Sequence, residues 1–458
     1  MGHGRPVALV PDPADPAGRA TLPEAAGGPL AFTFGSWFTW TAVGVAFPAL
    51  GAALIVASRS LAEGAYETRS ALAATHLATL GWGTMTIFGA AAQMAPALLG
   101  ARIPADRTLP WLYALFTIST AATVIGLAAG RFDVAAAGGA GLNLAAGWFI
   151  ALLVGGVASA GPNRAVLSPH IPAAILCFVL VLLWGTMLAA NLHWVFWPEI
   201  MAARRGLVVH LSLGLGGWFG LVVVGVFYRL VPIVHGARVA SRGRGALILV
   251  LALLALAGVM AGIGTGASWM LRVCAVLSAA ALVLFVGEIR HVLAHRRRRT
   301  SDLNVAHWYA VAAYSIILAI IGAGWGAGWV RTEPPGRLGA VTASLFLLGW
   351  VTQAIVGQLY KITPFLVWYY RATIPDVRAI PRQPAPYNPR PGRAVLWLSN
   401  AGAAGLALGM WIDAPWVAQT GAVCFAAAAC VLAYMLAYRW IPPVVTGSLG
   451  FEVRWRIS

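Results

Sequence analysis

Of the nine histidines, three lie in or beside long apolar segments on the side that the charge distribution predicts to be outer, where an imidazole is costly to bury. His170, His235, His291, His295 and His307 lie at or near the opposite ends of such segments, where a solvated or interfacial histidine is expected, and His3 lies in the N-terminal tail. His76 and His210 each fall inside such a segment, and His193 follows one, directly before Trp194. An ionisable side chain within a membrane segment marks a functional site by default, and imidazole is a common protein ligand of haem iron and copper. We therefore take His76, His210 and His193 as candidate metal ligands. The alternative for each is a neutral histidine that hydrogen-bonds a neighbouring segment or, for His193, an interfacial position.

The helical phase of the two buried histidines differs. His210 lies seven residues before Gly217, whereas His76 lies five residues before the matching Gly81. On regular α-helices residues spaced by seven share a face and residues spaced by five do not. The sequence therefore does not predict that the two imidazoles converge on one metal.

The composition places these histidines in an all-α integral membrane protein. The chain is 60% hydrophobic and 10% charged, while soluble domains carry about 25% charged residues. An apolar run of about 20 residues spans a bilayer. We expect a cytoplasmic disordered tail at 1–29 with no cleavable signal peptide, a transmembrane domain at 30–440 and a cytoplasmic tail at 441–458. The twelve expected spans are 30–58, 70–99, 109–129, 134–159, 171–192, 206–233, 245–265, 268–290, 305–326, 338–366, 394–412 and 415–438.

The net charge of +17 lies in the short loops between spans, which argues against a nucleic-acid partner and for contact with anionic membrane lipid. Loops after even-numbered spans carry a net +12 and loops after odd-numbered spans +1. The positive-inside rule then predicts that the even loops and both termini are cytoplasmic. The Ala/Gly/Arg bias, with Lys361 as the only lysine, is typical of a GC-rich genome. We expect a multi-pass protein of a bacterial plasma membrane.

A threefold repeat organises the spans. Gly-Trp is followed by a second glycine eight residues after the first and by a proline seven residues later, in Gly81-Trp82/Gly89/Pro96, Gly217-Trp218/Gly225/Pro232 and Gly349-Trp350/Gly357/Pro364. Small residues allow helices to approach closely in membranes. The spacing predicts three units of four spans around three inner helices, spans 2, 6 and 10.

Spans 2 and 6 of this layout each carry a histidine toward the expected outer face of the membrane. In this they resemble the corresponding spans of subunit I of the heme–copper oxidase superfamily. The stretch from Thr75 to Trp82 is similar to the family's second helix, which carries a low-spin haem ligand, and 206–232 is similar to its sixth, which carries a copper ligand. The resemblance implies the fold of cytochrome c oxidase subunit I, with haem b (heme b) as first candidate cofactor and copper as second. Room for the haem is expected beside Gly81, Gly89, Gly217 and Gly225. Trp82 and Trp218 are candidates to pack on it, and the alternative for each is packing on lipid or a neighbouring helix.

The remaining ligands of the family do not match. Span 10 has no histidine, span 7 has no histidine pair, and no tyrosine follows His210 by one turn. The four cysteines form no CxxCH motif, so covalent haem is not indicated. The expected function is that of a haem-binding, or copper-binding, membrane protein in respiratory electron transfer or diatomic-gas handling, without a complete oxygen-reducing centre. Its partners would be respiratory-chain subunits or a small electron carrier.

Two alternatives remain open at the level of sequence. One is a cofactor-free transporter or channel whose path uses the polar residues of the inner helices, Gln93, Arg229 and Lys361. The other is a structural subunit of a respiratory complex. Whether the protein is an enzyme is not decided by its residues.

Overall fold

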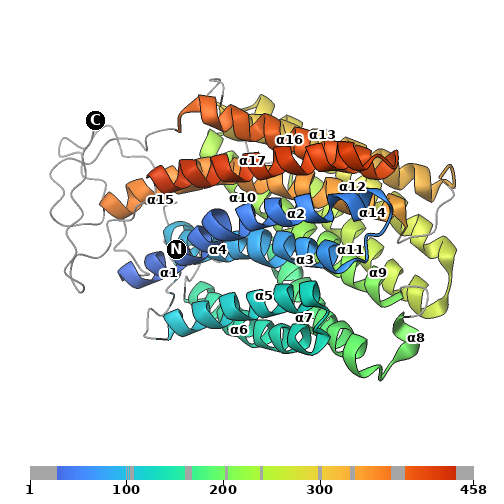
Figure 1. Cartoon of the computed structure of the whole chain (residues 1–458). Helices are drawn as coiled ribbons and strands as arrows, with labels where there is room; N and C mark the ends of the chain where they lie inside the picture. Colours follow the sequence, from blue (N-terminus) through green and yellow to red (C-terminus); the bar gives the residue numbers. More distant parts are fainter. Residues whose placement is uncertain are drawn as a thin grey trace, which may run out of the picture.

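The computed structural model describes residues 28–99, 101, 103, 108–159, 168–201, 205–237, 241–297, 302–330, 336–372 and 387–439, which form helices and contain no strand. The expected tails fall almost wholly outside these residues, as do several loop arginines used to predict the orientation, among them Arg102, Arg164 and Arg238. The helices run side by side along one direction (Figure 1). We call the end that carries the short helix α8 (Pro198–Met201) the α8 end, and the other the opposite end.

Four long helices contain a π-helical segment. They are α1–η1–α2 (Gly28–Trp40, Thr41–Ala46, Phe47–Ala62), α3–η2–α4 (Arg69–His76, Leu77–Thr84, Met85–Leu99), α9–η5–α10 (Arg205–Leu211, Ser212–Gly220, Leu221–His235) and α14–η6–α15 (Arg337–Ser344, Leu345–Val351, Thr352–Ala372). The regular helices are α5 (Leu109–Ala129), α6 (Phe132–Ala158), α7 (His170–Trp194), α11 (Arg242–Thr265), α12 (Ser268–Ala294), α13 (Leu303–Gly326), α16 (Pro389–Trp411) and α17 (Pro415–Arg439).

Eleven helical stretches of the described chain are long and apolar enough to cross a membrane. Their outward side chains include many apolar residues, which in a membrane contact lipid. The stretch Arg69–Leu99, the second expected span, is one continuous helix but is not among the eleven. Its polar residues, including Thr75, His76 and Gln93, lower its mean hydropathy. The structure thus confirms an all-α membrane architecture, and the count of twelve spans stays a prediction.

The three repeated Gly-Trp pairs lie within the π-helical segments η2, η5 and η6. A π-helical turn holds more residues than an α-turn and is frequent at functional sites. The π-helical turn therefore rotates the side chains that precede it about the helix axis, relative to those that follow it. The phase that an α-helix would assign to residues before Gly81 and Gly217 does not apply.

Two tryptophans of the repeat link the three inner helices, and the third, Trp350, donates to Ser315 of α13 over 2.8 Å. Trp218 donates from Nε1 to the Thr84 hydroxyl over 3.0 Å, and Trp82 donates to Thr352 over 3.3 Å. Each acceptor lies three residues after the first glycine of its own repeat, where the second repeat has Gly220. All three tryptophans are almost fully buried. This confirms that the helices carrying the repeat form the centre of the bundle.

The glycines of the repeat are contact points between helices. A Cβ on Gly81 would lie 3.0 Å from Ala46, and one on Gly217 would lie 2.6 Å from the Cβ of Cys177. A Cβ on Gly89 would lie 2.8 Å from the carbonyl oxygen of Gly35. The expectation of close helix packing is therefore confirmed. The expectation that these glycines leave room for a cofactor is wrong, because neighbouring helices already occupy the space.

Candidate functional site

A cavity of about 540 Å³ lies toward the α8 end. Its walls come from the inner helices α3, η2, α9 and η5, from the outer helices α5, α6 and α7, and from α14 and η6 on the far side. Most lining residues are leucine, alanine, glycine or threonine, and the cavity reaches the loop before α3 at the exposed Glu67. Pockets of this size and character hold small organic ligands.

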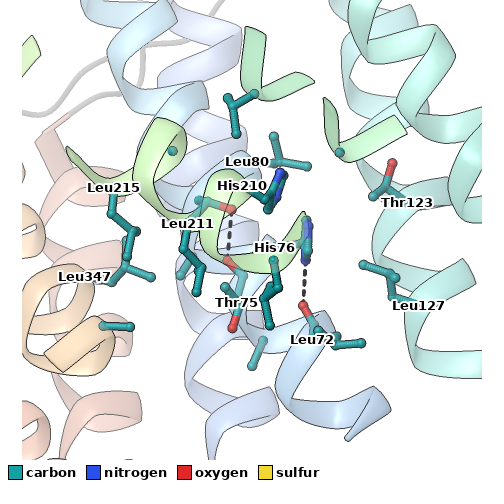
Figure 2. Close-up of a pocket in the computed structure, with 18 of the residues that line it drawn as sticks. Leu72, Thr75, His76, Leu80, Thr123, Leu127, His210, Leu211, Leu215 and Leu347 are labelled. Atoms are coloured by element: carbon teal, nitrogen blue, oxygen red, sulfur yellow. Dashed lines mark hydrogen bonds between the residues drawn. The ribbon is translucent and has the colours of Figure 1, made fainter. Parts of the chain in front are cut away.

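His76 and His210 both line this cavity, and their ring centres are 6.2 Å apart with planes inclined by 24° (Figure 2). His76 is the last residue of α3, directly before η2, and His210 is the second residue before η5. Both side chains thus precede a π-helical turn, on neighbouring inner helices. The structure brings together two histidines that α-helical phase placed on different faces.

Hydrogen bonding settles the role of each ring nitrogen of His76. Its Nδ1 lies 2.8 Å from the carbonyl oxygen of Leu72. A carbonyl only accepts, so Nδ1 carries the hydrogen and the lone pair is on Nε2. Such a hydrogen bond to one ring nitrogen is the usual device that orients a metal-binding imidazole.

His210 is held in a different way. Its Nδ1 is buried and meets no hydrogen-bonding group of the described chain. The helix that carries it is anchored at its start, where Trp184 donates to the carbonyl oxygen of Gly206 over 2.9 Å. Behind the ring lies Gly185 of α7, on which a Cβ would be only 2.7 Å from Cε1 of His210. Gly185 therefore lets the imidazole approach α7 closely.

The threonines of the cavity wall add little polarity. Four of them donate their hydroxyl hydrogen to a carbonyl one turn earlier in their own helix: Thr75, Thr79, Thr123 and Thr186. Thr84 accepts the indole hydrogen of Trp218. The polar groups in the cavity are therefore mainly the two imidazoles, with Glu67 and Tyr66 at the mouth.

The separation of the imidazoles can be compared with that of a metal-bridged pair. A metal ion lies about 2 Å from each ligand nitrogen, and each nitrogen lies about 1 Å from its ring centre, so two bridged ring centres are about 6 Å apart. The distance of 6.2 Å fits one metal between His76 and His210. Among the described residues no group of three or more His, Cys, Asp or Glu is arranged to hold a metal.

The remaining predicted site residues lie elsewhere. His193 is exposed at the end of α7 against the edge of Trp194, with ring centres 4.8 Å apart, and it does not line the cavity. Trp82 is stacked on Phe47 at 3.9 Å and faces away from the cavity, whereas Trp218 lines it. The prediction that Trp82 packs on a cofactor is therefore not supported by its position. The other tryptophan expected there, Trp218, does line the cavity.

Sequence reasoning missed Gly185 and Thr186. The available signal was a small-residue pair in the bulky stretch of α7 from Leu182 to Met187. Nothing in the sequence connects that pair to His210, 25 residues further along the chain, because the contact is between two helices.

The chain was compared with protein-family models and with curated proteins, and neither comparison finds a match. The class is therefore defined by the fold and the site alone: an all-α membrane protein with an internal apolar cavity that holds a histidine pair.

Proposed function

We propose that this protein binds one b-type haem in the cavity, that His76 and His210 would hold it, and that it acts in electron transfer within a membrane. The observation that carries the proposal is the pair of imidazoles, 6.2 Å apart, in an otherwise apolar cavity. The proposal keeps the twelve-span, three-by-four arrangement related to cytochrome c oxidase subunit I. It replaces the expected glycine-lined site by the cavity.

The character of the cavity favours haem over a lone copper ion. Two imidazoles alone would suffice for a copper ion, which needs no space beyond its ligands. A space of about 540 Å³ with apolar walls suits a macrocycle instead. Haem bound there supplies a one-electron redox centre.

The residues of this chain would set the properties of that centre. The Leu72 carbonyl raises the basicity of His76 through its hydrogen bond to Nδ1. The apolar walls exclude water and lower the local dielectric constant. With both His76 and His210 holding it, the haem would supply electron transfer rather than gas binding.

The alternative function, a cofactor-free transporter or channel, has less support than haem binding. The three tryptophans of the repeat are buried, and Trp218 and Trp82 hydrogen-bond between the inner helices. Transporter sites lie near the midplane, at helices that are broken there. The inner helices continue through this level as π-helical segments.

We further propose that the α8 end faces outward in a bacterial plasma membrane, since the arginine-rich loops belong to the opposite end. A small electron carrier or another respiratory subunit would then approach the haem from the outer side. The cavity mouth at Glu67 lies on that side.

The test is a spectrum of the protein purified in detergent from haem-sufficient cells, with a pyridine haemochrome assay and elemental analysis for copper. We expect about one haem per chain. His76→Ala and His210→Ala should each abolish the haem spectrum of the wild type, and His193→Ala, the matched control, should leave it unchanged. Copper without haem would overturn the choice of cofactor, and a protein free of both would overturn the proposal.

A further inference from the structure

A second set of buried polar groups lies toward the opposite end, between α13, α15 and α16. His307 is fully buried, and its Nδ1 lies 2.6 Å from Oε1 of Gln353. Gln353 donates from Nε2 to the hydroxyl of Ser399 over 2.9 Å, and Ser399 donates to the carbonyl oxygen of Leu396. In this series of hydrogen bonds each residue donates to the next one, from His307 toward the Leu396 carbonyl. His307 therefore carries its hydrogen on Nδ1, and Nε2 has a free lone pair.

Two polar atoms next to this series have no partner in the described protein. They are Nε2 of His307 and the hydroxyl of Tyr360, whose rings are 5.4 Å apart. The side chains are 0% and 6% exposed, so bulk water does not reach them directly. Buried polar groups nearly always find a hydrogen-bonding partner. The partner needed here must donate to Nε2 and can also bond a phenolic hydroxyl.

We propose that α13 and α15 enclose an internal water site, in which ordered water donates to Nε2 of His307 and bonds the hydroxyl of Tyr360. Water is the smallest group that both donates and accepts, and buried water typically makes about three hydrogen bonds to groups of this kind. An apolar ligand would leave both atoms unpaired. The rival explanation is a direct hydrogen bond from Tyr360 to His307 after a small rotation.

Polar groups connect this site to the surface of the opposite end. Lys361, next to Tyr360 in the chain, pairs with Asp302, and both side chains are about a quarter exposed. Asp302 also accepts from the backbone N–H of Asn304. Asn304 in turn accepts from Nε2 of His235 and donates to the Gly357 carbonyl. Water would therefore enter from this end.

The site is separate from the histidine cavity. None of its residues lines that cavity. The inference therefore stands whether or not haem is bound.

The test is X-ray hydroxyl-radical footprinting of the purified full-length protein, read out by mass spectrometry. Bound internal water labels adjacent side chains although they are inaccessible to bulk solvent. Tyr314, also in this helical layer and also 6% exposed, is the matched control. We expect Tyr360 to be modified at least severalfold faster than Tyr314, and His307→Leu to slow the labelling of Tyr360.

Equal, slow labelling of Tyr360 and Tyr314 would overturn the proposal in favour of the direct hydrogen bond. Fast labelling of Tyr360 that persists in His307→Leu would also overturn it, because the water would then not be held by His307. If the variant does not fold, the comparison of the two tyrosines in the wild-type protein decides.

Discussion

Gly185→Ala should weaken cofactor binding without destabilising the fold. The new Cβ would lie 2.7 Å from Cε1 of His210, whereas ordinary contacts begin near 3.4 Å. The imidazole must therefore retreat by about 0.7 Å, the difference between these two distances. It can do so because the cavity lies beside it. The strain is thus released by the movement of one side chain.

The expected size of the effect follows from metal geometry. Metal–ligand distances tolerate about ±0.2 Å, so the displacement is several times what the bond accepts. Changes around metal ligands typically cost 10–100-fold in affinity. We expect haem affinity to fall by about that factor, or the spectrum to change to that of a centre with one weakened axial ligand.

Stability should respond differently. Alanine is favoured over glycine in a helix by up to about 1 kcal/mol, which offsets the small cost of moving His210. The thermal midpoint should therefore change by less than about 2 °C. Gly147→Ala is the matched control, because nothing lies within 4 Å of a Cβ at that position of α6. Its haem affinity should equal that of the wild type.

The assay is a titration of the haem-free protein with haemin, followed by absorbance, with thermal unfolding measured in parallel. The reasoning would be refuted if Gly185→Ala folded and bound haem with wild-type affinity and an unchanged spectrum. A parallel loss of affinity in Gly147→Ala would also refute it, since the effect would then not come from His210.

Thr84→Val should destabilise the protein by about 1–2 kcal/mol in a denaturing-detergent titration, because the indole N–H of Trp218 loses its buried acceptor. Thr117→Val is the control and should be neutral, because the Thr117 hydroxyl has no partner within the described chain. Equal destabilisation by the two substitutions would contradict a stabilising role for the hydrogen bond from Trp218 to Thr84. Gly217→Ala should destabilise by about 1–3 kcal/mol, because its Cβ would lie 2.6 Å from that of Cys177. Adding Cys177→Gly should recover at least about 1 kcal/mol of this in the same titration, and strict additivity would argue against the contact.

The all-α membrane architecture and the glycines at helix–helix contacts could be predicted from the sequence, because both depend on local composition. Runs of apolar residues must form helices in a bilayer, since every backbone polar group has to be paired within the segment. Gly81 and Gly217 recur at one register because a helix contact needs a small residue on each inner helix. That part of the prediction requires no knowledge of which helices are neighbours.

The candidate site could be predicted only in part. His76 and His210 were identified by their residue type in an apolar setting. Their convergence could not be foreseen from α-helical phase, because the π-helical turns that follow them change the rotation of each helix. Trp82 and Trp218 lie within those turns and hydrogen-bond residues that are far away in the sequence.

Because hydropathy and residue size act locally, the order of the residues is enough to specify a membrane-embedded helical bundle in which three helices carry one repeated pattern. The position of the cavity depends on how the helices pack against one another. Neighbouring helices fill the surroundings of Gly81 and Gly217, and Gly185 of a different helix provides room for His210. A cavity depends on the packing between helices, and packing is a property of pairs of segments that no single segment encodes.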